Sequence, residues 1–169
     1  MSISAIRPGK TKLVPFSLSI VCLILLAVSA TFAAKQSSNS ADKSLHIYFV
    51  DVEGGQSTLF VTPEHQSLLV DTGWPGFQGR DADRIVAAAK KAGLSKIDYV
   101  LITHFHMDHV GGAPQLAERI PVGTFIDHGP IRENEKATVE VWQAYQKLLA
   151  TGKYKHVTAK PETGFQSRV

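Results

Sequence analysis

The stretch LITHFHMDHVGG, residues 101–112, concentrates metal-binding and titratable side chains directly after an apolar run. The preceding residues 97–103, IDYVLIT, have the composition of a buried strand. His104 and His106 are two residues apart, so an extended backbone projects both imidazoles to the same side. Asp108 and His109 follow where the chain must turn, so four candidate ligands converge at one strand end: His104, His106, Asp108 and His109.

The residue types in this cluster match the ligand preferences of zinc. Imidazole nitrogen and carboxylate oxygen both bind zinc, and a catalytic zinc keeps an open position for water. Two metal ions that share a water generate hydroxide near neutral pH and polarise a carbonyl or phosphoryl oxygen. Asp108 adds a negative charge and serves as the candidate catalytic base. Gly111 and Gly112 permit unusual backbone angles at the turn. The HxHxDH spacing therefore predicts a metal site rather than isolated surface histidines.

Strands and helices are expected on both sides of this stretch. Upstream, residues 45–52, 57–62 and 67–73 read as a meander of three short strands, the first of them buried. Residues 80–93 predict a helix capped by Asp81 or Asp83 and stopped at Gly93. Downstream we expect a helix from Ala113 to about Arg119, a strand at 123–127, a helix at about 134–150 and a strand near 154–159. This order predicts an α/β domain with helices covering a sheet.

The first 33 residues have the features of a targeting segment. Arg7, Lys10 and Lys12 precede an apolar stretch that ends in small residues, which predicts a signal peptide cut after Ala33. The alternative is an uncleaved membrane anchor at residues 13–34, because this length suffices to span a bilayer. Either reading exports the domain, as a periplasmic, secreted or anchored protein. Residues 34–44 are then a linker, and residues 45–169 the domain.

Charge and cysteine content narrow the classes of function. Three of the 18 Lys and Arg residues lie in the targeting segment, which leaves 15 against 15 Asp and Glu in the rest of the chain. A nearly neutral domain gives no electrostatic support to nucleic-acid binding. The only cysteine, Cys22, lies in the apolar segment, so the domain contains no disulfide and no thiol ligand.

These residues carry a resemblance to a known family. THFHMDHVGG, residues 103–112, resembles the HxHxDH signature of the metallo-β-lactamase-fold hydrolases, and LLVDTG, residues 68–73, resembles their strand that ends in aspartate. YFVDVEGGQSTLFVT, residues 48–62, is similar to the first hairpin of the DNA-internalisation-related branch. That branch usually has Gly-Gln-Gly-Asp where this chain has Glu-Gly-Gly-Gln at residues 53–56. The resemblance covers roughly residues 45–160.

The resemblance implies an αββα sandwich with two zinc ions at one edge. His104 and His106 would bind the first metal, and Asp108 and His109 the second. Asp71 would orient the ligands from behind, a role with a physical basis. His128, in FIDHGP, is either a pocket residue or a surface histidine. The implied enzyme is a hydrolase in which metal-bound hydroxide attacks an ester, amide, lactam or phosphodiester of a small-molecule substrate.

The family pattern needs more ligands than this chain contains. A third histidine on the first metal, a bridging aspartate and a last histidine normally lie well downstream. After His109 only Asp127, His128 and His156 remain, outside any recognisable family motif. We therefore interpret the chain as the N-terminal half of the sandwich, truncated at its C-terminus. The alternatives are an inactive or metal-binding remnant and, opposed by the neutral charge, a membrane-anchored nuclease module for DNA uptake.

Overall fold

The computed structural model describes residues 43–160, which belong to the second of the two units, residues 1–40 and 41–169, into which the chain divides. The predicted signal peptide or anchor lies outside the described residues, as do residues 34–42 of the predicted linker and residues 161–169. Within the described part, no helix combines the length and the apolar character that crossing a bilayer requires. The assignments made for the N-terminal segment therefore stay predictions.

The first three strands form an antiparallel meander, as predicted. β1 (His46–Phe49), β2 (Thr58–Val61) and β3 (Ser67–Val70) follow one another along one side of a six-stranded sheet. The prediction that the first strand is buried is wrong. β1 is the edge strand of the sheet, and the side chains of Ile47 and Phe49 are 46% and 84% exposed because they project from its uncovered face.

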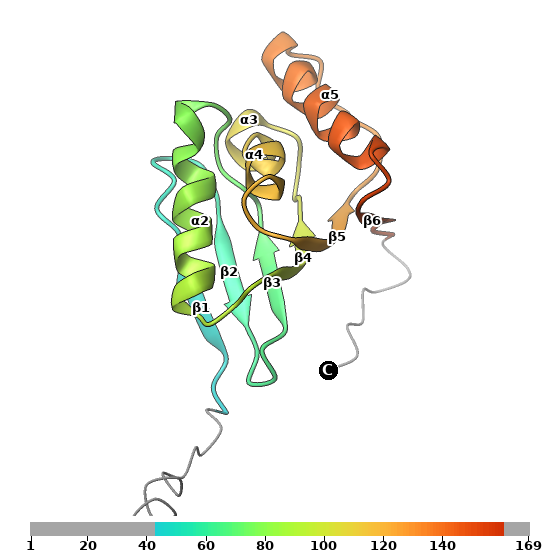
Figure 1. The fold of residues 1–169 in the computed structure, drawn as a ribbon. Helices are drawn as coiled ribbons and strands as arrows, with labels where there is room; N and C mark the ends of the chain where they lie inside the picture. Colours follow the sequence, from blue (N-terminus) through green and yellow to red (C-terminus); the bar gives the residue numbers. More distant parts are fainter. Residues whose placement is uncertain (1–42, 161–169) are drawn as a thin grey trace, which may run out of the picture. The chain divides into compact units, whose positions relative to one another are not determined.

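The remaining strands are parallel and are reached through helices. β4 (Ile97–Leu101), β5 (Val122–Asp127) and β6 (Lys155–Thr158) complete a sheet whose strand order follows the sequence. A short turn η1 (Phe77–Gly79) and α2 (Arg80–Lys91) precede β4. Helices α3 (Met107–Val110) and α4 (Ala113–Ala117) precede β5, and α5 (Lys136–Ala150) precedes β6 (Figure 1). The predicted α/β class is confirmed.

Helix α2 begins differently from the prediction. Its N-cap is Gly79 in the left-handed conformation, with φ of 84°, and no side chain caps it. Asp81 is buried instead, and its carboxylate accepts hydrogen bonds from the Trp74 backbone N–H at 2.9 Å and from Arg80 Nε at 2.7 Å. The sequence therefore predicts the helix and its end before Gly93 (φ 76°) but not its start, because Asp81 holds the preceding loop.

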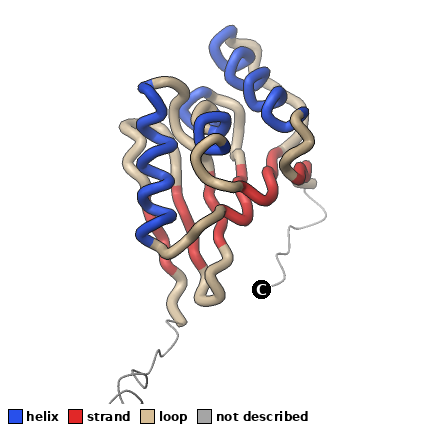
Figure 2. Tube along the Cα trace, viewed as in Figure 1, coloured by secondary structure: helices blue, strands red, loops and turns tan. Residues whose placement is uncertain are grey.

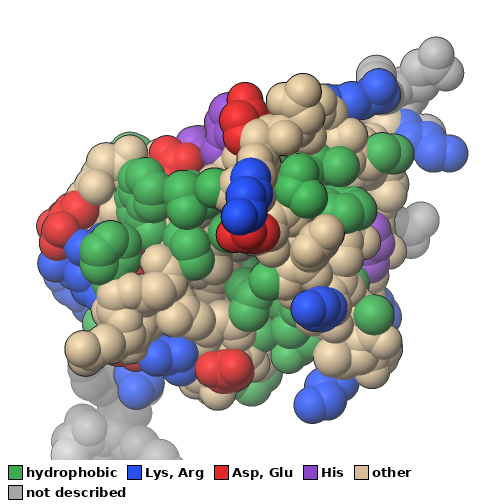
Figure 3. All heavy atoms as spheres, turned by 90° about the horizontal axis from the view of Figure 1, so that it is seen from above, with side chains coloured by type: hydrophobic (Ala, Val, Ile, Leu, Met, Phe, Trp, Pro, Cys, Tyr) green, Lys and Arg blue, Asp and Glu red, His purple; other side chains and the backbone are tan. Residues whose placement is uncertain are grey.

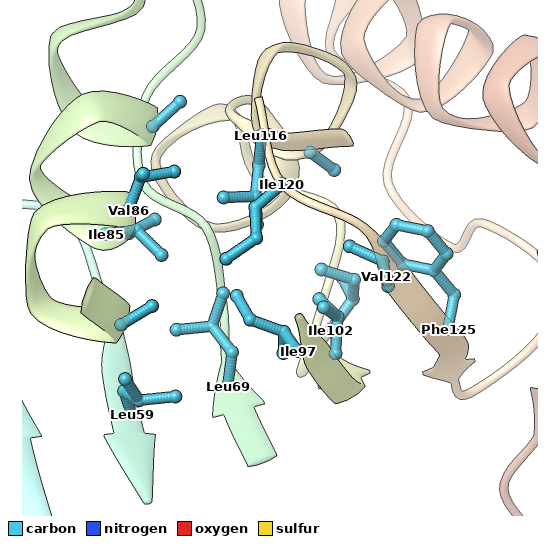
Figure 4. Close-up of a cluster of buried hydrophobic side chains, with 14 of the residues drawn as sticks. Leu59, Leu69, Ile85, Val86, Ile97, Ile102, Leu116, Ile120, Val122 and Phe125 are labelled. Atoms are coloured by element: carbon cyan, nitrogen blue, oxygen red, sulfur yellow. The ribbon is translucent and has the colours of Figure 1, made fainter. Parts of the chain in front are cut away.

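The hydrophobic core lies between the sheet and its helices. Leu59, Leu69, Val100 and Phe125 are neighbours across four adjacent strands and are fully buried. Helices cover this row with buried side chains, among them Ile85 and Ala89 of α2, Leu116 of α4 and Tyr145 of α5. Figure 4 shows Ile85 and Leu116 together with Leu59, Leu69 and Phe125 of the strands. Burying one large apolar side chain contributes about 1.5–3 kcal/mol, so the side chains buried on this face stabilise the fold together.

The opposite face of the sheet is apolar as well. Phe60, Leu68 and Tyr99 are neighbours across β2, β3 and β4, and all three are only half buried. Figures 1 and 2 show α2, α3 and α4 together on the other side of the strands. The described residues thus form one sheet with helices on one face, which corresponds to one α/β half of the expected sandwich.

The parallel arrangement brings three chain segments to one edge of the sheet. Since β3, β4 and β5 run in the same direction, their carboxyl ends lie side by side. Asp71 follows β3, residues 102–106 follow β4, and His128 follows β5. Ligands of open α/β sheets bind at the carboxyl ends of the strands, so this edge is where a functional site is expected.

Candidate metal centre

Asp71 joins the ends of β3 and β4. Its Oδ1 accepts a hydrogen bond from the Thr103 backbone N–H at 2.8 Å, and its Oδ2 accepts one from Thr103 Oγ1 at 2.7 Å. The residue is fully buried and has φ of 59°, a left-handed conformation that is uncommon outside glycine. A buried carboxylate in a strained conformation needs strong partners, and these bonds fix it at the strand ends.

His104 and His106 lie on the same side of the chain. His104 Nε2 faces His106 Nδ1 at 3.0 Å, and the ring centroids are 4.7 Å apart. Phe105 between them points the other way and is fully buried in the core. The two-residue spacing therefore works as the sequence suggests, with one apolar side chain anchoring the segment and two imidazoles facing outward.

Asp108 and His109 come from the short helix α3. His109 Nδ1 is 2.8 Å from Asp71 Oδ2, and His109 Nε2 is 3.7 Å from Asp108 Oδ2. The carboxylate of Asp71 accepts a hydrogen bond from the Nδ1–H of His109, which leaves His109 Nε2 as the lone-pair nitrogen on the side of Asp108. The His109 ring also lies 3.8 Å from that of His104, measured between centroids, so the His104–His106 pair and the Asp108–His109 pair share one site.

The turn that carries Asp108 and His109 is held by backbone hydrogen bonds from two other loops. The Gln56 N–H donates to the Asp108 carbonyl at 3.1 Å, and the Thr72 N–H donates to the His109 carbonyl at 2.7 Å. Gly55 lies so close that an added Cβ would be 2.6 Å from the Asp108 carbonyl oxygen. The first hairpin thus packs against the site turn, and Gly55 permits that approach.

Gly111 and Gly112 serve a different purpose from the predicted one. Their φ angles are −62° and −77°, which any residue adopts, so the expectation of unusual backbone angles is wrong. A Cβ at Gly111 would collide with the Met107 carbonyl oxygen and Pro75, and a Cβ at Gly112 with the Thr72 carbonyl oxygen. These glycines are required by the close packing of the turn against the loop after β3.

The environment of the cluster favours neutral imidazole at His104. Partial burial lowers the pKa of His104, and the neighbouring rings of His109 and His106 lower it further. Neutral imidazole is the form that donates a lone pair to a metal.

The donor atoms fit a divalent metal in kind and in pair spacing. Neighbouring ligand atoms around a tetrahedral zinc lie about 3.3 Å apart. The facing atoms here are separated by 3.0 Å in the His104–His106 pair and by 3.7 Å in the Asp108–His109 pair. As they stand, no three His, Cys, Asp or Glu side chains within residues 43–160 are arranged to hold a metal ion. Each pair supplies two donors where a catalytic zinc has three protein ligands.

His128 lies behind the cluster rather than in it. Its ring packs against Phe105, with 4.7 Å between the centroids, and the residue is exposed. Glu133, from the same loop, was not singled out by the sequence. Burial would raise the pKa of Glu133, but backbone N–H groups of Glu133 and Arg132 and the charges of His106 and His128 lower it. The sequence signal that could have indicated Glu133 is its position as an acidic residue in the loop after β5. Figure 3 shows histidine side chains beside acidic ones on this upper face.

The fold and the cluster define an α/β protein with paired histidine and aspartate donors at the carboxyl ends of parallel strands. The sequence model of the metallo-beta-lactamase superfamily matches residues 51–166. The chain therefore belongs to the metallo-beta-lactamase superfamily. By this resemblance it is a metallohydrolase.

Two curated relatives carry hydrolase names. A metal-dependent hydrolase of Herpetosiphon aurantiacus is 37% identical over 76 residues, which is 44% of this chain and 29% of the relative. The hydroxyacylglutathione hydrolase of Stenotrophomonas maltophilia is 30% identical over 103 residues, which is 61% of this chain and 36% of the relative. The chain thus spans about a third of the length of the curated relatives it matches.

A metallo beta lactamase from Hirschia baltica aligns with 74% of this chain and 52% of its own, at 18% identity and a TM-score of 0.39.

Proposed function

We propose that this chain forms the N-terminal part of a zinc-dependent hydrolase active on a small molecule with an ester-like bond. The observation that carries the proposal is the meeting of two donor pairs at one sheet edge, with His109 Nδ1 held by the buried Asp71 at 2.8 Å. Ligating histidines characteristically donate a hydrogen bond from their second ring N–H to such a carboxylate.

Each residue has a distinct task in this proposal. His104 Nε2 and His106 Nδ1 would hold the first metal, and Asp108 Oδ2 and His109 Nε2 would hold the second. Zinc bound there would supply a water of lowered pKa and would polarise a carbonyl or phosphoryl oxygen. Asp108, which is about a quarter exposed, would accept a proton from the attacking water at the carboxylate oxygen that does not hold the metal. Asp71 fixes the tautomer and direction of His109 and ties Thr103 to the same carboxylate.

The substrate class follows from charge and from the relatives. The neutral charge balance of residues 34–169 offers no field for a polyanion, which disfavours nucleic acid as the substrate. One relative is named a hydroxyacylglutathione hydrolase, a name that supports acyl transfer to water as the reaction. Lactams, amides and phosphodiesters are the neighbouring classes. We also propose that the protein is exported, on the strength of the basic and apolar N-terminal segment.

A second candidate is a metal-binding remnant without turnover. One observation favours it: among the described residues each metal would have two protein ligands, whereas a catalytic zinc has three. Both candidates use the same metal-binding residues, but only the first candidate hydrolyses a substrate.

Hydrolysis assays on the full-length protein separate these candidates. We expect zinc-dependent hydrolysis of a thioester, lactam or phosphodiester, and we expect His106→Ala to abolish it. The matched control is His65→Asn, in the β2–β3 turn, because asparagine tolerates the left-handed φ of 60° at this position. Equal activity in His106→Ala and in the control would refute the assignment of His106 to the metal site of the enzyme. Bound zinc without activity on any substrate would favour the remnant.

A further inference from the structure

A second polar cluster surrounds Asp127 at the end of β5. The carboxylate is buried and accepts three hydrogen bonds: from the Gly129 backbone N–H at 2.8 Å, from Tyr145 Oη at 3.0 Å and from His156 Nε2 at 2.8 Å. Its partners come from the following loop, from α5 and from β6. The proposed function uses none of these residues, and the sequence places Asp127 and His156 outside any recognisable family motif.

Burying the Asp127 carboxylate costs free energy, and its three hydrogen bonds offset that cost. A buried carboxylate loses its hydration and persists only when its oxygens are hydrogen bonded. Burial raises the pKa of the Tyr145 phenol, and the charge of Asp127 raises it further, so the phenol stays a donor. Asp127 Oδ1 faces Gly129, and Oδ2 is shared by Tyr145 and His156. One carboxylate oxygen therefore bonds to the loop after β5, and the other bonds to α5 and β6.

The loop bond leads toward the metal-binding segment. Gly129 has φ of 91°, and its N–H bond to Asp127 fixes the chain where His128 leaves the sheet. The His128 ring then packs on Phe105 with centroids 4.7 Å apart and planes tilted by 49°. Tyr145, which also donates to Asp127, contacts the same Phe105 ring, with 6.0 Å between the ring centroids.

Phe105 is the buried anchor of the segment that carries two ligands. It is fully buried and lies between His104 and His106, whose nitrogens face each other at 3.0 Å. A shift of Phe105 moves both flanking backbones, because the three residues are consecutive. Packing density in a core leaves little room to absorb such a shift.

We propose that Asp127 is a positioning residue of the metal centre, which holds His128 and Tyr145 against Phe105 and so sets the spacing of His104 and His106. This proposal rests on the proposed function for the identity of the ligands. The contacts that carry it are the hydrogen bonds of Asp127 and the two ring contacts with Phe105.

The zinc affinity of three full-length variants tests the positioning role. Asp127→Ala removes all three bonds, and we expect a loss of affinity of about 10–100-fold, as for other residues behind metal ligands. Asp127→Asn keeps an oxygen for the Gly129 N–H and should recover most of the affinity. Asp98→Ala is the matched control: Asp98 accepts bonds from Ser67 N and Oγ at 3.0 Å each, from the strand end opposite to the site. It should lower stability and leave zinc affinity unchanged.

Histidine side-chain NMR spectra of the metal-free protein distinguish a failure of this proposal from a failure of the proposed function. In Asp127→Ala we expect shifted or broadened ring signals for His104, His106 and His128, with those of His65 unchanged. Unchanged His104 and His106 signals would overturn the positioning role, whether or not the wild-type protein binds zinc. Equal losses of zinc affinity in Asp127→Ala and Asp98→Ala would overturn it as well. If Asp127→Ala does not fold, Tyr145→Phe, which removes only one bond and keeps the ring, takes its place under the same criteria.

Discussion

Asp71 illustrates how one buried side chain organises the proposed site. Its two oxygens bind Thr103 and His109, which come from two different elements. The sequence indicates this residue through its position at the end of the third strand. It does not indicate Thr103, because a lone threonine after a strand has no distinctive pattern.

Asp71→Asn should weaken metal binding more than it weakens the fold. The amide keeps the shape but presents an N–H group where His109 Nδ1 and Thr103 Oγ1 now donate. We expect zinc affinity to fall about 10–100-fold, measured by competition with a chelator. Asp98→Asn, which alters a polar contact between the same two strands at their other end, is the control. A similar affinity for zinc in both variants would contradict the orienting role.

Gly111 tests the close packing of the site turn. Gly111→Ala forces its Cβ into the Met107 carbonyl and Pro75, so we expect about 1–3 kcal/mol of lost stability. The turn should also shift, so zinc affinity should fall together with stability. Gly152→Ala meets open space and carries only the strain of its φ of 68°, about 1–2 kcal/mol. A Gly111→Ala protein with wild-type zinc affinity would show that the turn tolerates the added methyl group.

At the scale of elements, the sequence predicts type and order better than ends or burial. Every expected strand and helix is present because the apolar runs and glycine stops are strong local signals. Burial of β1 was mispredicted, since an edge position depends on pairing that the strand itself does not encode. The N-cap of α2 was also mispredicted, because Asp81 is drawn to the Trp74 N–H, a contact outside the helix.

The pairing of β3 with β4 should depend on pH through Asp98. Burial alone would raise the pKa of Asp98, but hydrogen bonds from Lys96 and Ser67 outweigh it and lower the pKa below its ordinary value. A lowered folded-state pKa stabilises the protein above the unfolded pKa of about 3.9, and this stabilisation is lost as the pH falls through the folded value.

Urea unfolding of the wild-type protein and Asp98→Asn measures this contribution. The variant should be less stable at about pH 7, and the difference should shrink toward about pH 3 and vanish below the folded pKa. Glu64→Gln, in the exposed β2–β3 turn, is a control that should track the wild-type protein. A difference that stays constant with pH would contradict the charged role of Asp98.

At the scale of the whole molecule, residues 43–160 form one sheet with its covering helices and carry two donor pairs. The superfamily could be identified from HxHxDH because its spacing is local and chemically specific. The alternation of apolar and polar residues along the strands did not predict that the second face of the sheet is apolar. Phe60, Leu68 and Tyr99 lie half buried on that face. The role of Asp127 could not be read either, since its partners are 2, 18 and 29 residues away.

The metal content of the purified full-length protein tests the central claim most directly. We predict that the wild-type protein and His65→Asn retain zinc after dialysis and that His106→Ala loses most of it, because one of the two facing nitrogens is gone. Elemental analysis per mole of protein gives the answer without knowledge of the substrate. A wild-type protein that binds no zinc, or a His106→Ala protein that binds as much as the wild type, would contradict the assignment of this cluster as the metal centre.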